Sequence, residues 1–322
     1  MFRFRKRCGT QLHFRQGLST SVSGARTAPP AERSIILNLL VAVRPNQWTK
    51  NLIIFAALIF GERLFEPIAV AHAVGAFIAF CGLSGGVYLI NDITDREQDR
   101  WHPVKRARPI ASGALPVRTA IGAALILESV ALAGSFWISV RLGLVALSYL
   151  TLLTLYSVVL KHVVIVDVLT IAIGFVLRAV AGGEAVSVPV SHWLLVCTIL
   201  LALFLTLSKR RHELVLLADD ASGYRATLDE YSPYLLDQMI GIVTASTVMS
   251  YILYATDPAT VARFGTEWLE LTIPLPLYGI FRYLYLVHQK GGGTPSELLL
   301  TDRPLVVCVA LWALAVVVII YR

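Results

Sequence analysis

A series of long apolar stretches separated by short polar loops most constrains how this chain can fold. A helix that crosses a bilayer needs about 20 mostly apolar residues, and stretches of that length recur along most of the sequence. Charged residues make up only 15% of the 322 residues, whereas a soluble globular domain has about 25%. This shortage argues against a soluble enzyme, and the apolar content excludes a disordered chain. The pattern predicts an all-α integral membrane protein.

We predict about nine membrane-spanning helices. Their expected ranges are 46–65, 68–90, 117–138, 142–160, 163–183, 190–208, 234–256, 268–288 and 303–321. The first range is the weakest, because polar residues occupy its start. Residues 1–33 are basic and rich in Gly, Ser and Thr, which predicts a mobile arm ahead of a single transmembrane domain over residues 34–322.

The basic residues predict the orientation of these helices. If the N-terminus is cytoplasmic, 23 of the 28 Lys and Arg residues fall in segments on the cytoplasmic side. Basic loops stay on that side under the positive-inside rule. Lys and Arg lie between apolar runs rather than over a soluble basic fold, which argues against a nucleic-acid partner. We expect a multi-pass protein of the cell (inner or plasma) membrane. The sequence leaves open whether it forms a homo-oligomer.

The polar loop after the second predicted span contains a row of acidic residues. If the helix continues to His102, which precedes a proline, then Asn91, Asp95, Asp99 and His102 follow one another at i, i+4, i+8 and i+11. This spacing places them on one stripe of a helix, with Asp92 beside it. Three stacked carboxylates repel one another, so the stripe requires a positive partner.

Two interpretations of this row compete. The acids could form a solvated helix end in which they pair with neighbours such as Arg96 and Arg100. Alternatively, a few carboxylates hold Mg²⁺ while a substrate diphosphate fills its other positions, as Mg²⁺ prefers. The cations that follow, Lys105, Arg106 and Arg108, suit phosphate oxygens. Their combination with the acidic row favours the magnesium site.

Residues 91–113 read NDITDREQDRWHPVKRARPIASG. This stretch resembles the NDxxDxxxDxxHPxKxxRPxxxG signature of the UbiA superfamily of membrane prenyltransferases, and the resemblance covers about residues 40–321. It implies a UbiA-type helical bundle with its active site on the cytoplasmic side. It also implies that Asp92, Asp95 and Asp99 are catalytic and hold Mg²⁺ together with Asn91.

One branch of the superfamily is the most similar. Residues 43–51, VRPNQWTKN, are similar to the RPxQWxKN pattern of decaprenyl-phosphate phosphoribosyltransferases. Further similarities lie at residues 160–162, 178–183, 209–213 and 282–283. Quinone-type members have a second aspartate motif between their sixth and seventh helices, and this chain has no DxxxD there. The departure argues against quinone-type chemistry.

The resemblance implies transfer of 5-phosphoribose from phosphoribosyl pyrophosphate to a polyprenyl (decaprenyl) phosphate, with release of pyrophosphate, in the synthesis of cell-wall arabinan precursors. Two anionic substrates need one Mg²⁺ site and fixed cations. The candidate substrate-binding residues are Arg44, Gln47, Lys50, Tyr88, Asn91, His102, Lys105, Arg108, Lys161, Arg178, Lys209, Arg210 and Arg282. The alternatives are a UbiA-type prenyltransferase that joins a prenyl diphosphate to an aromatic acceptor and, less favoured, a transporter.

Several of these residues also have a structural interpretation. Arg178 could snorkel to water from the outer end of its span. His102 could cap a helix end, and Lys161 could anchor a short inner turn. Arg44 and Lys50 could be positive-inside anchors of the first span.

Overall fold

The computed structural model of the protein describes residues 34–216, 230–289, 298 and 301–322. The predicted N-terminal arm lies outside these residues. Every regular element within the described residues is a helix, which confirms the predicted all-α class. Seven of the helices are long and apolar enough to cross a membrane. They are α3 (Pro67–Thr94), α5 (Val117–Ile138), α6 (Val140–Val158), α7 (Val166–Val186), α8 (His192–Leu216), α9 (Pro233–Thr256) and α13 (Arg303–Ile320).

The other two predicted spans are each divided in the structure. The range 46–65 begins as a 3₁₀ helix, η1 (Pro45–Ile53), and continues as the short α2 (Ile54–Phe60). The range 268–288 consists of η4 (Trp268–Thr272) and α11 (Pro274–Gln289). The start of the first range is polar, and Pro274 and Pro276 lie at the start of α11, where a proline lacks the N–H that would continue an earlier helix. The count of about nine spans is therefore not confirmed.

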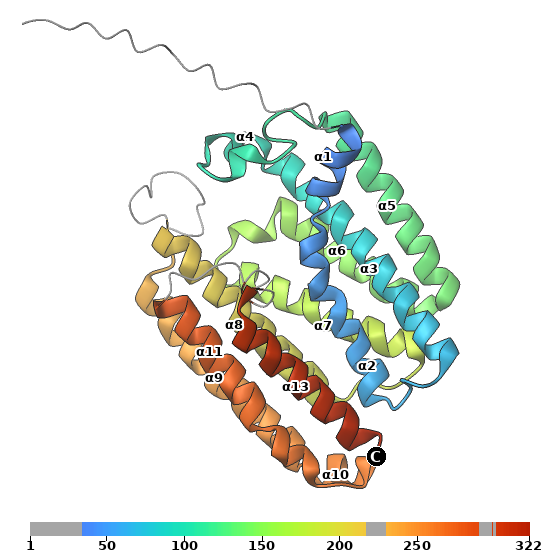
Figure 1. The fold of residues 1–322 in the computed structure, drawn as a ribbon. Coiled ribbons are helices and arrows are strands. Elements are labelled where there is room, and N and C mark those ends of the chain that lie inside the picture. The colour runs from blue at the N-terminus through green and yellow to red at the C-terminus, as the bar shows by residue number, and fades with distance from the viewer. Residues whose placement is uncertain (1–33, 217–229, 290–297, 299–300) are drawn as a thin grey trace, which may run out of the picture. The chain divides into compact units, whose positions relative to one another are not determined.

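Shorter helices connect these elements. They are α1 (Ile35–Ala42), α4 (Arg96–Trp101), η2 (Lys105–Ala107), η3 (Leu160–His162) and α10 (Pro258–Phe264). Helix α3 packs against α5, α6 and α7, while α8 packs against α7 and α9, and α11 against α13 (Figure 1). Helices α4 and η2 follow the C-terminal end of α3, and η3 follows that of α6. These three short helices form the end of the bundle that contains the candidate site.

A close approach of α2 to α7 fixes one wall of that site. A Cβ atom built on Gly182 of α7 would lie 2.1 Å from the carbonyl oxygen of Ile54. Only glycine allows the two backbones to come this close, and small residues serve this purpose at helix contacts in membranes. The contact places η1, which leads into α2, beside α7.

Candidate functional site

A cavity of about 1520 Å³ extends through the bundle between η1 and α2 on one side and α8, α9, α11 and α13 on the other. This volume exceeds the 300–1,000 Å³ typical of small-molecule pockets. One end is polar, and its polar lining residues include Arg44, Gln47, Lys50, Tyr88, Asp92, His102, Lys105, Arg108, Lys209, His212 and Glu213. The remainder is mostly apolar and includes Phe60, Cys197, Tyr254, Trp312 and Val316. Such a cavity suits an amphiphile with an anionic head and a long apolar tail.

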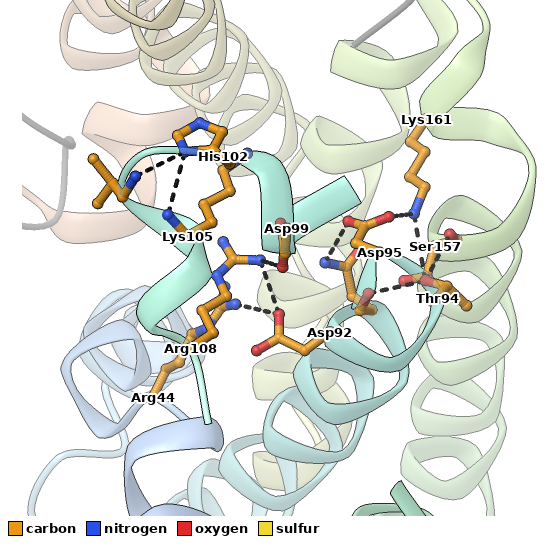
Figure 2. Close-up of polar contacts among 12 residues, drawn as sticks. Arg44, Asp92, Thr94, Asp95, Asp99, His102, Lys105, Arg108, Ser157 and Lys161 are labelled. Atoms are coloured by element: carbon orange, nitrogen blue, oxygen red, sulfur yellow. Dashed lines mark hydrogen bonds and ion pairs between the residues drawn. The ribbon is translucent and has the colours of Figure 1, made fainter. Parts of the chain in front are cut away.

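Arg108 joins two buried carboxylates at the polar end. Its Nη1 donates to Asp99 Oδ2 at 2.6 Å and to Asp92 Oδ1 at 3.1 Å, and Figure 2 shows the guanidinium between the two acids. Asp92 is 1% exposed and Asp99 is 3% exposed. Burial raises the pKa of Asp99, while the positive charge and hydrogen bond of Arg108 act in the opposite direction. The pairing makes two neighbouring carboxylates tolerable in a desolvated place.

Asp95 takes a different direction from the other two acids. Its Oδ1 forms an ion pair with Lys161 Nζ, and its Oδ2 accepts a hydrogen bond from Asn91 Nδ2 at 3.1 Å (Figure 2). The helix is interrupted at Asp95, which has φ −89° and ψ 0° and separates α3 from α4. The predicted single stripe is therefore wrong: Asn91 and Asp95 pair as expected at i, i+4, but Asp99 faces Arg108 together with Asp92.

Arg44, which directly precedes η1, contacts one of these acids, Asp92. Its Nη2 donates to Asp92 Oδ1, and its guanidinium lies 4.8 Å from the centre of the Tyr88 ring. Arg44 precedes η1 with a positive φ of 54°, a conformation that costs a non-glycine residue about 1–3 kcal/mol and is enriched at functional sites. The strain, the ion pair and the ring contact fix Arg44 at the cavity.

His102 organises the loop that follows α4. Its Nδ1 accepts hydrogen bonds from the backbone N–H of Val104 at 3.1 Å and of Lys105 at 3.2 Å. Burial and the positive charges of Lys105 and Arg108 lower the pKa of His102, and the negative charge of Glu213 opposes this effect. These contacts support the capping role considered for His102 and place Lys105 at the cavity.

Lys50 lines the cavity from η1, outside the seven candidate spans. Burial, with the positive charges of Arg178 and Arg44, lowers the pKa of Lys50 to about 7. The next residue, Asn51, is buried and accepts a hydrogen bond from Arg178 Nε at 2.7 Å. Lys50 thus lies at the cavity, while its neighbour attaches η1 to α7.

Arg178 does not reach water. It is 5% exposed, donates to Tyr149 Oη at 2.7 Å, and its guanidinium lies 4.9 Å from the centres of the Tyr149 and Phe175 rings. The snorkelling interpretation is therefore wrong. Arg178 is also absent from the cavity lining, so its role as a substrate contact stays a prediction.

Helix α8 contributes Lys209 to the cavity but directs Arg210 away from it. Arg210 is 4% exposed and its Nε donates to Asp167 at 3.0 Å. Its Nη1 donates to Glu213 Oε2, also at 3.0 Å. On α11, Arg282 forms an ion pair with Asp302 at 2.8 Å and does not line the cavity. Both substrate roles stay predictions.

The residues present fit a magnesium ion held partly by substrate. Among the described residues, no group of three or more His, Cys, Asp or Glu side chains could hold a metal ion by itself. Mg²⁺ commonly takes one or two carboxylates and completes its shell with waters and substrate phosphates. Asp92 and Asp99, which converge on one Arg108 nitrogen, provide that number of carboxylates. The predicted metal roles of Asp92, Asp99, Asp95 and Asn91 all stay predictions.

The sequence also contained a signal for two cavity residues that we did not predict as site residues. His212 and Glu213 follow Lys209 at i+3 and i+4, positions that share one face of a helix, and all three line the cavity. The predicted position of Lys209 at the site was therefore sufficient to predict that its two helical neighbours lie there as well.

Comparison with known proteins gives consistent matches. The sequence model of the UbiA prenyltransferase family matches residues 51–301. A decaprenyl-phosphate phosphoribosyltransferase of Corynebacterium glutamicum is 33% identical, covering 91% of this chain and 89% of the relative. The enzyme of the same name from Mycolicibacterium smegmatis is 33% identical over 89% and 93%. A UbiA homologue from Archaeoglobus fulgidus, solved with GPP and Mg²⁺, has a TM-score of 0.68 at 19% identity, covering 88% of this chain and all of that one.

Proposed function

Because the chain belongs to the UbiA prenyltransferase family, we propose that it is a membrane transferase that moves 5-phosphoribose from phosphoribosyl pyrophosphate to a polyprenyl phosphate, such as decaprenyl phosphate, and releases pyrophosphate. The names of the relatives that are one-third identical over nine-tenths of the chain support this choice. The observation that carries it is the cavity, which joins a cation-rich end to a long apolar arm.

The charges at the polar end suit two phosphorylated substrates. Arg44 and Arg108 present planar guanidinium groups that can bind phosphate oxygens in pairs, whereas Lys50, Lys105 and Lys209 present compact charges. A donor with a diphosphate and a 5-phosphate, together with a lipid monophosphate, would use several such cations at once. A prenyl diphosphate and an aromatic acceptor without a phosphate would need fewer.

The proposed metal role follows from the same geometry. Asp92 and Asp99, which share one Arg108 nitrogen, would hold Mg²⁺ against the donor diphosphate. The archaeal homologue solved with GPP and Mg²⁺ supports the use of a divalent ion beside a diphosphate. When bound, Mg²⁺ neutralises charge on the leaving group. Arg108 and Arg44 lie within hydrogen-bonding distance of Asp92 and would turn toward phosphate oxygens. Asp95 would have to release Lys161 before it could contact the ion.

The transfer itself demands little acid–base chemistry. As the bond from the anomeric carbon to the diphosphate lengthens, that carbon gains oxocarbenium character, as in glycoside chemistry. A phosphate oxygen of the lipid is already anionic and can attack this carbon directly. The protein therefore has to position two anions and stabilise the leaving diphosphate, which is electrostatic catalysis.

The surrounding membrane arrangement is part of the proposal. We place the polar end at the cytoplasmic face of the cell membrane, because most of the basic residues that the structure describes lie in or next to the connections at that end. The apolar arm then lies at the depth of the hydrocarbon core and holds the polyprenyl chain. Residues 34–322 would form this one domain.

The proposal is tested with purified protein in lipid nanodiscs, Mg²⁺, radiolabelled phosphoribosyl pyrophosphate and decaprenyl phosphate. We expect label in the lipid fraction, loss of that label in Asp92→Asn, and its retention in Asp237→Asn. Asp237 forms an ion pair with Arg211 and does not line the cavity, so it is a matched control. If instead a prenyl diphosphate and an aromatic acid react while the lipid stays unlabelled, the UbiA-type prenyltransferase is the correct function.

A further inference from the structure

The polar end of the cavity has an uneven distribution of charge. Among the described residues that line the cavity, the acidic ones are Asp92 and Glu213. Asp92 accepts hydrogen bonds from two arginines and lies where the metal is proposed. Glu213 belongs to α8, a different wall from the α3–α4 region that provides Asp92.

The carboxylate of Glu213 is held in place by its own helix. Arg210 Nη1 donates to Oε2 at 3.0 Å, and Lys209 Nζ lies 3.6 Å from Oε1. Arg210 is in turn fixed by Asp167, which is 0% exposed and also accepts a hydrogen bond from Tyr231 at 3.0 Å. A buried network therefore orients an acid whose side chain keeps 22% of its surface exposed at the cavity.

A fixed carboxylate among phosphate-binding cations has to be explained. Its charge would repel the diphosphate of the donor and the monophosphate of the lipid. Beyond its ion pairs with Arg210 and Lys209, it can bind a substrate favourably only where that substrate presents hydrogen-bond donors. Of the two proposed substrates, the donor has such groups in its ribose hydroxyls, which lie between its two phosphorylated carbons. A carboxylate has about four acceptor positions, so it can bind a hydroxyl while it keeps its ion pair.

We propose that Glu213 binds the ribose 2- and 3-hydroxyls of the phosphoribosyl donor, with Arg210 and Asp167 as positioning residues. The inference rests on the proposed function and deepens it. In this arrangement the α3–α4 region holds the diphosphate, and α8 holds the sugar. The anomeric carbon lies between these two anchors, and the side of this carbon that neither anchor covers faces the lipid phosphate. Glu213 then makes the enzyme selective for a ribose donor over a deoxyribose donor.

The test assays two enzymes and one control variant with three donors. Wild type and Glu213→Gln are assayed with phosphoribosyl pyrophosphate and with its 2-deoxy and 3-deoxy analogues. A hydrogen bond to a charged group contributes about 1.5–3 kcal/mol, so wild type should prefer the ribose donor to at least one analogue by about 10- to 100-fold in kcat/KM. Glu213→Gln should lose most of this preference, mainly through the KM of the ribose donor, and Asp237→Asn should keep it.

Three results separate the explanations. If Glu213→Gln folds, is slower with every donor and keeps the wild-type preference, the side chain has only a structural role and the inference is wrong. If the variant instead requires a higher Mg²⁺ concentration and keeps the preference, Glu213 acts on a metal and the inference is also wrong. If wild type transfers nothing from the ribose donor, the proposed function itself fails. Where Glu213→Gln does not fold, Glu213→Asp, which retracts the carboxylate, should reduce the preference in the same direction.

Discussion

Replacement of Arg108 by glutamine tests whether the two buried acids of the site depend on one guanidinium. In Arg108→Gln, Asp92 and Asp99 lose the cation that joins them at 3.1 Å and 2.6 Å. Their side chains are 2% and 4% exposed, so little water reaches them to replace the lost partner. Asp92 keeps its ion pair with Arg44, and Asp99 is the acid most affected.

The expected magnitude follows from these contacts. Two hydrogen bonds to charged groups contribute about 3–6 kcal/mol together. Arg44 remains on Asp92, the new glutamine can donate one bond, and Arg108 itself is 24% exposed. We therefore expect the variant to lose about 2–4 kcal/mol of stability at neutral pH. The control is Arg282→Gln, which removes a more exposed pair with Asp302 and should cost about 0–1 kcal/mol.

The pH dependence has a defined sign. Burial already raises the pKa of Asp99, and the positive charge of Arg108 opposes this rise, so the variant should raise the pKa further. A carboxyl whose pKa is higher in the folded state than in the unfolded state destabilises the protein above that pKa, and the cost disappears as pH falls below its unfolded value. The deficit of Arg108→Gln should therefore be largest near pH 7–8 and shrink toward pH 4.

Thermal unfolding in detergent, followed by tryptophan fluorescence between pH 4 and pH 8, measures these effects. Added Mg²⁺ should raise the Tm of Arg108→Gln more than that of wild type, because the released carboxylates can bind the ion without displacing a guanidinium. If Arg108→Gln and Arg282→Gln unfold alike at every pH, and Mg²⁺ acts equally on both, the reasoning about the two acids is refuted.

Three further predictions concern the walls of the cavity. Burial and neighbouring arginines lower the pKa of Lys50 to about 7, so the affinity of the free enzyme for the phosphoribosyl donor should fall from pH 6 to pH 8. Lys50→Arg should flatten this pH dependence; if calorimetry gives the same dependence of affinity on pH for both proteins, the prediction is contradicted. Gly182→Ala would place a Cβ 2.1 Å from the Ile54 carbonyl oxygen, and should lower the stability of the protein by about 1–3 kcal/mol, measured as a lower Tm. Gly122→Ala, with open space around the new Cβ, should not lower the Tm. Trp312→Ala removes a large apolar surface from the cavity and should raise the KM for decaprenyl phosphate about 10-fold with the donor KM unchanged; equal KM values for the lipid would exclude this wall from lipid binding.

The fold was predictable to the extent that the lengths of the apolar stretches determine it. Seven predicted spans correspond to single long helices, because a helix in a bilayer must satisfy its own backbone over a fixed thickness. The interruption at residues 45–53 was not predictable in form, since polarity shows that a span is weak but not that it becomes a 3₁₀ helix. That outcome depends on the tertiary contacts of Asn51 and on the close approach at Gly182.

The site was predictable where its residues lie near one another in sequence. The signature and the RPxQWxKN-like segment identified Arg44, Lys50, Asp92 and Arg108, which all line one cavity. The prediction did not distinguish cavity-lining cations from those buried behind the wall. Arg178 lies 127 residues from its partner Asn51, and nothing in its local sequence indicates that contact.

The ion pairs of the site explain how so many charges can share a membrane protein before substrate binds. Asp92 is paired with Arg44 and Arg108, Asp95 with Lys161, and Glu213 with cations of its own helix. A buried charge without a partner would cost several kcal/mol. On the proposed function, a magnesium–diphosphate unit would provide both signs at once: the aspartates would hold the ion in place of Arg108, and the arginines would hold the phosphates in place of the aspartates. Such an exchange leaves no charge unpaired, so binding of the metal and of the donor should be strongly coupled. Mg²⁺ alone would have to displace Arg108 without compensation and should bind far more weakly than it does in the presence of the donor.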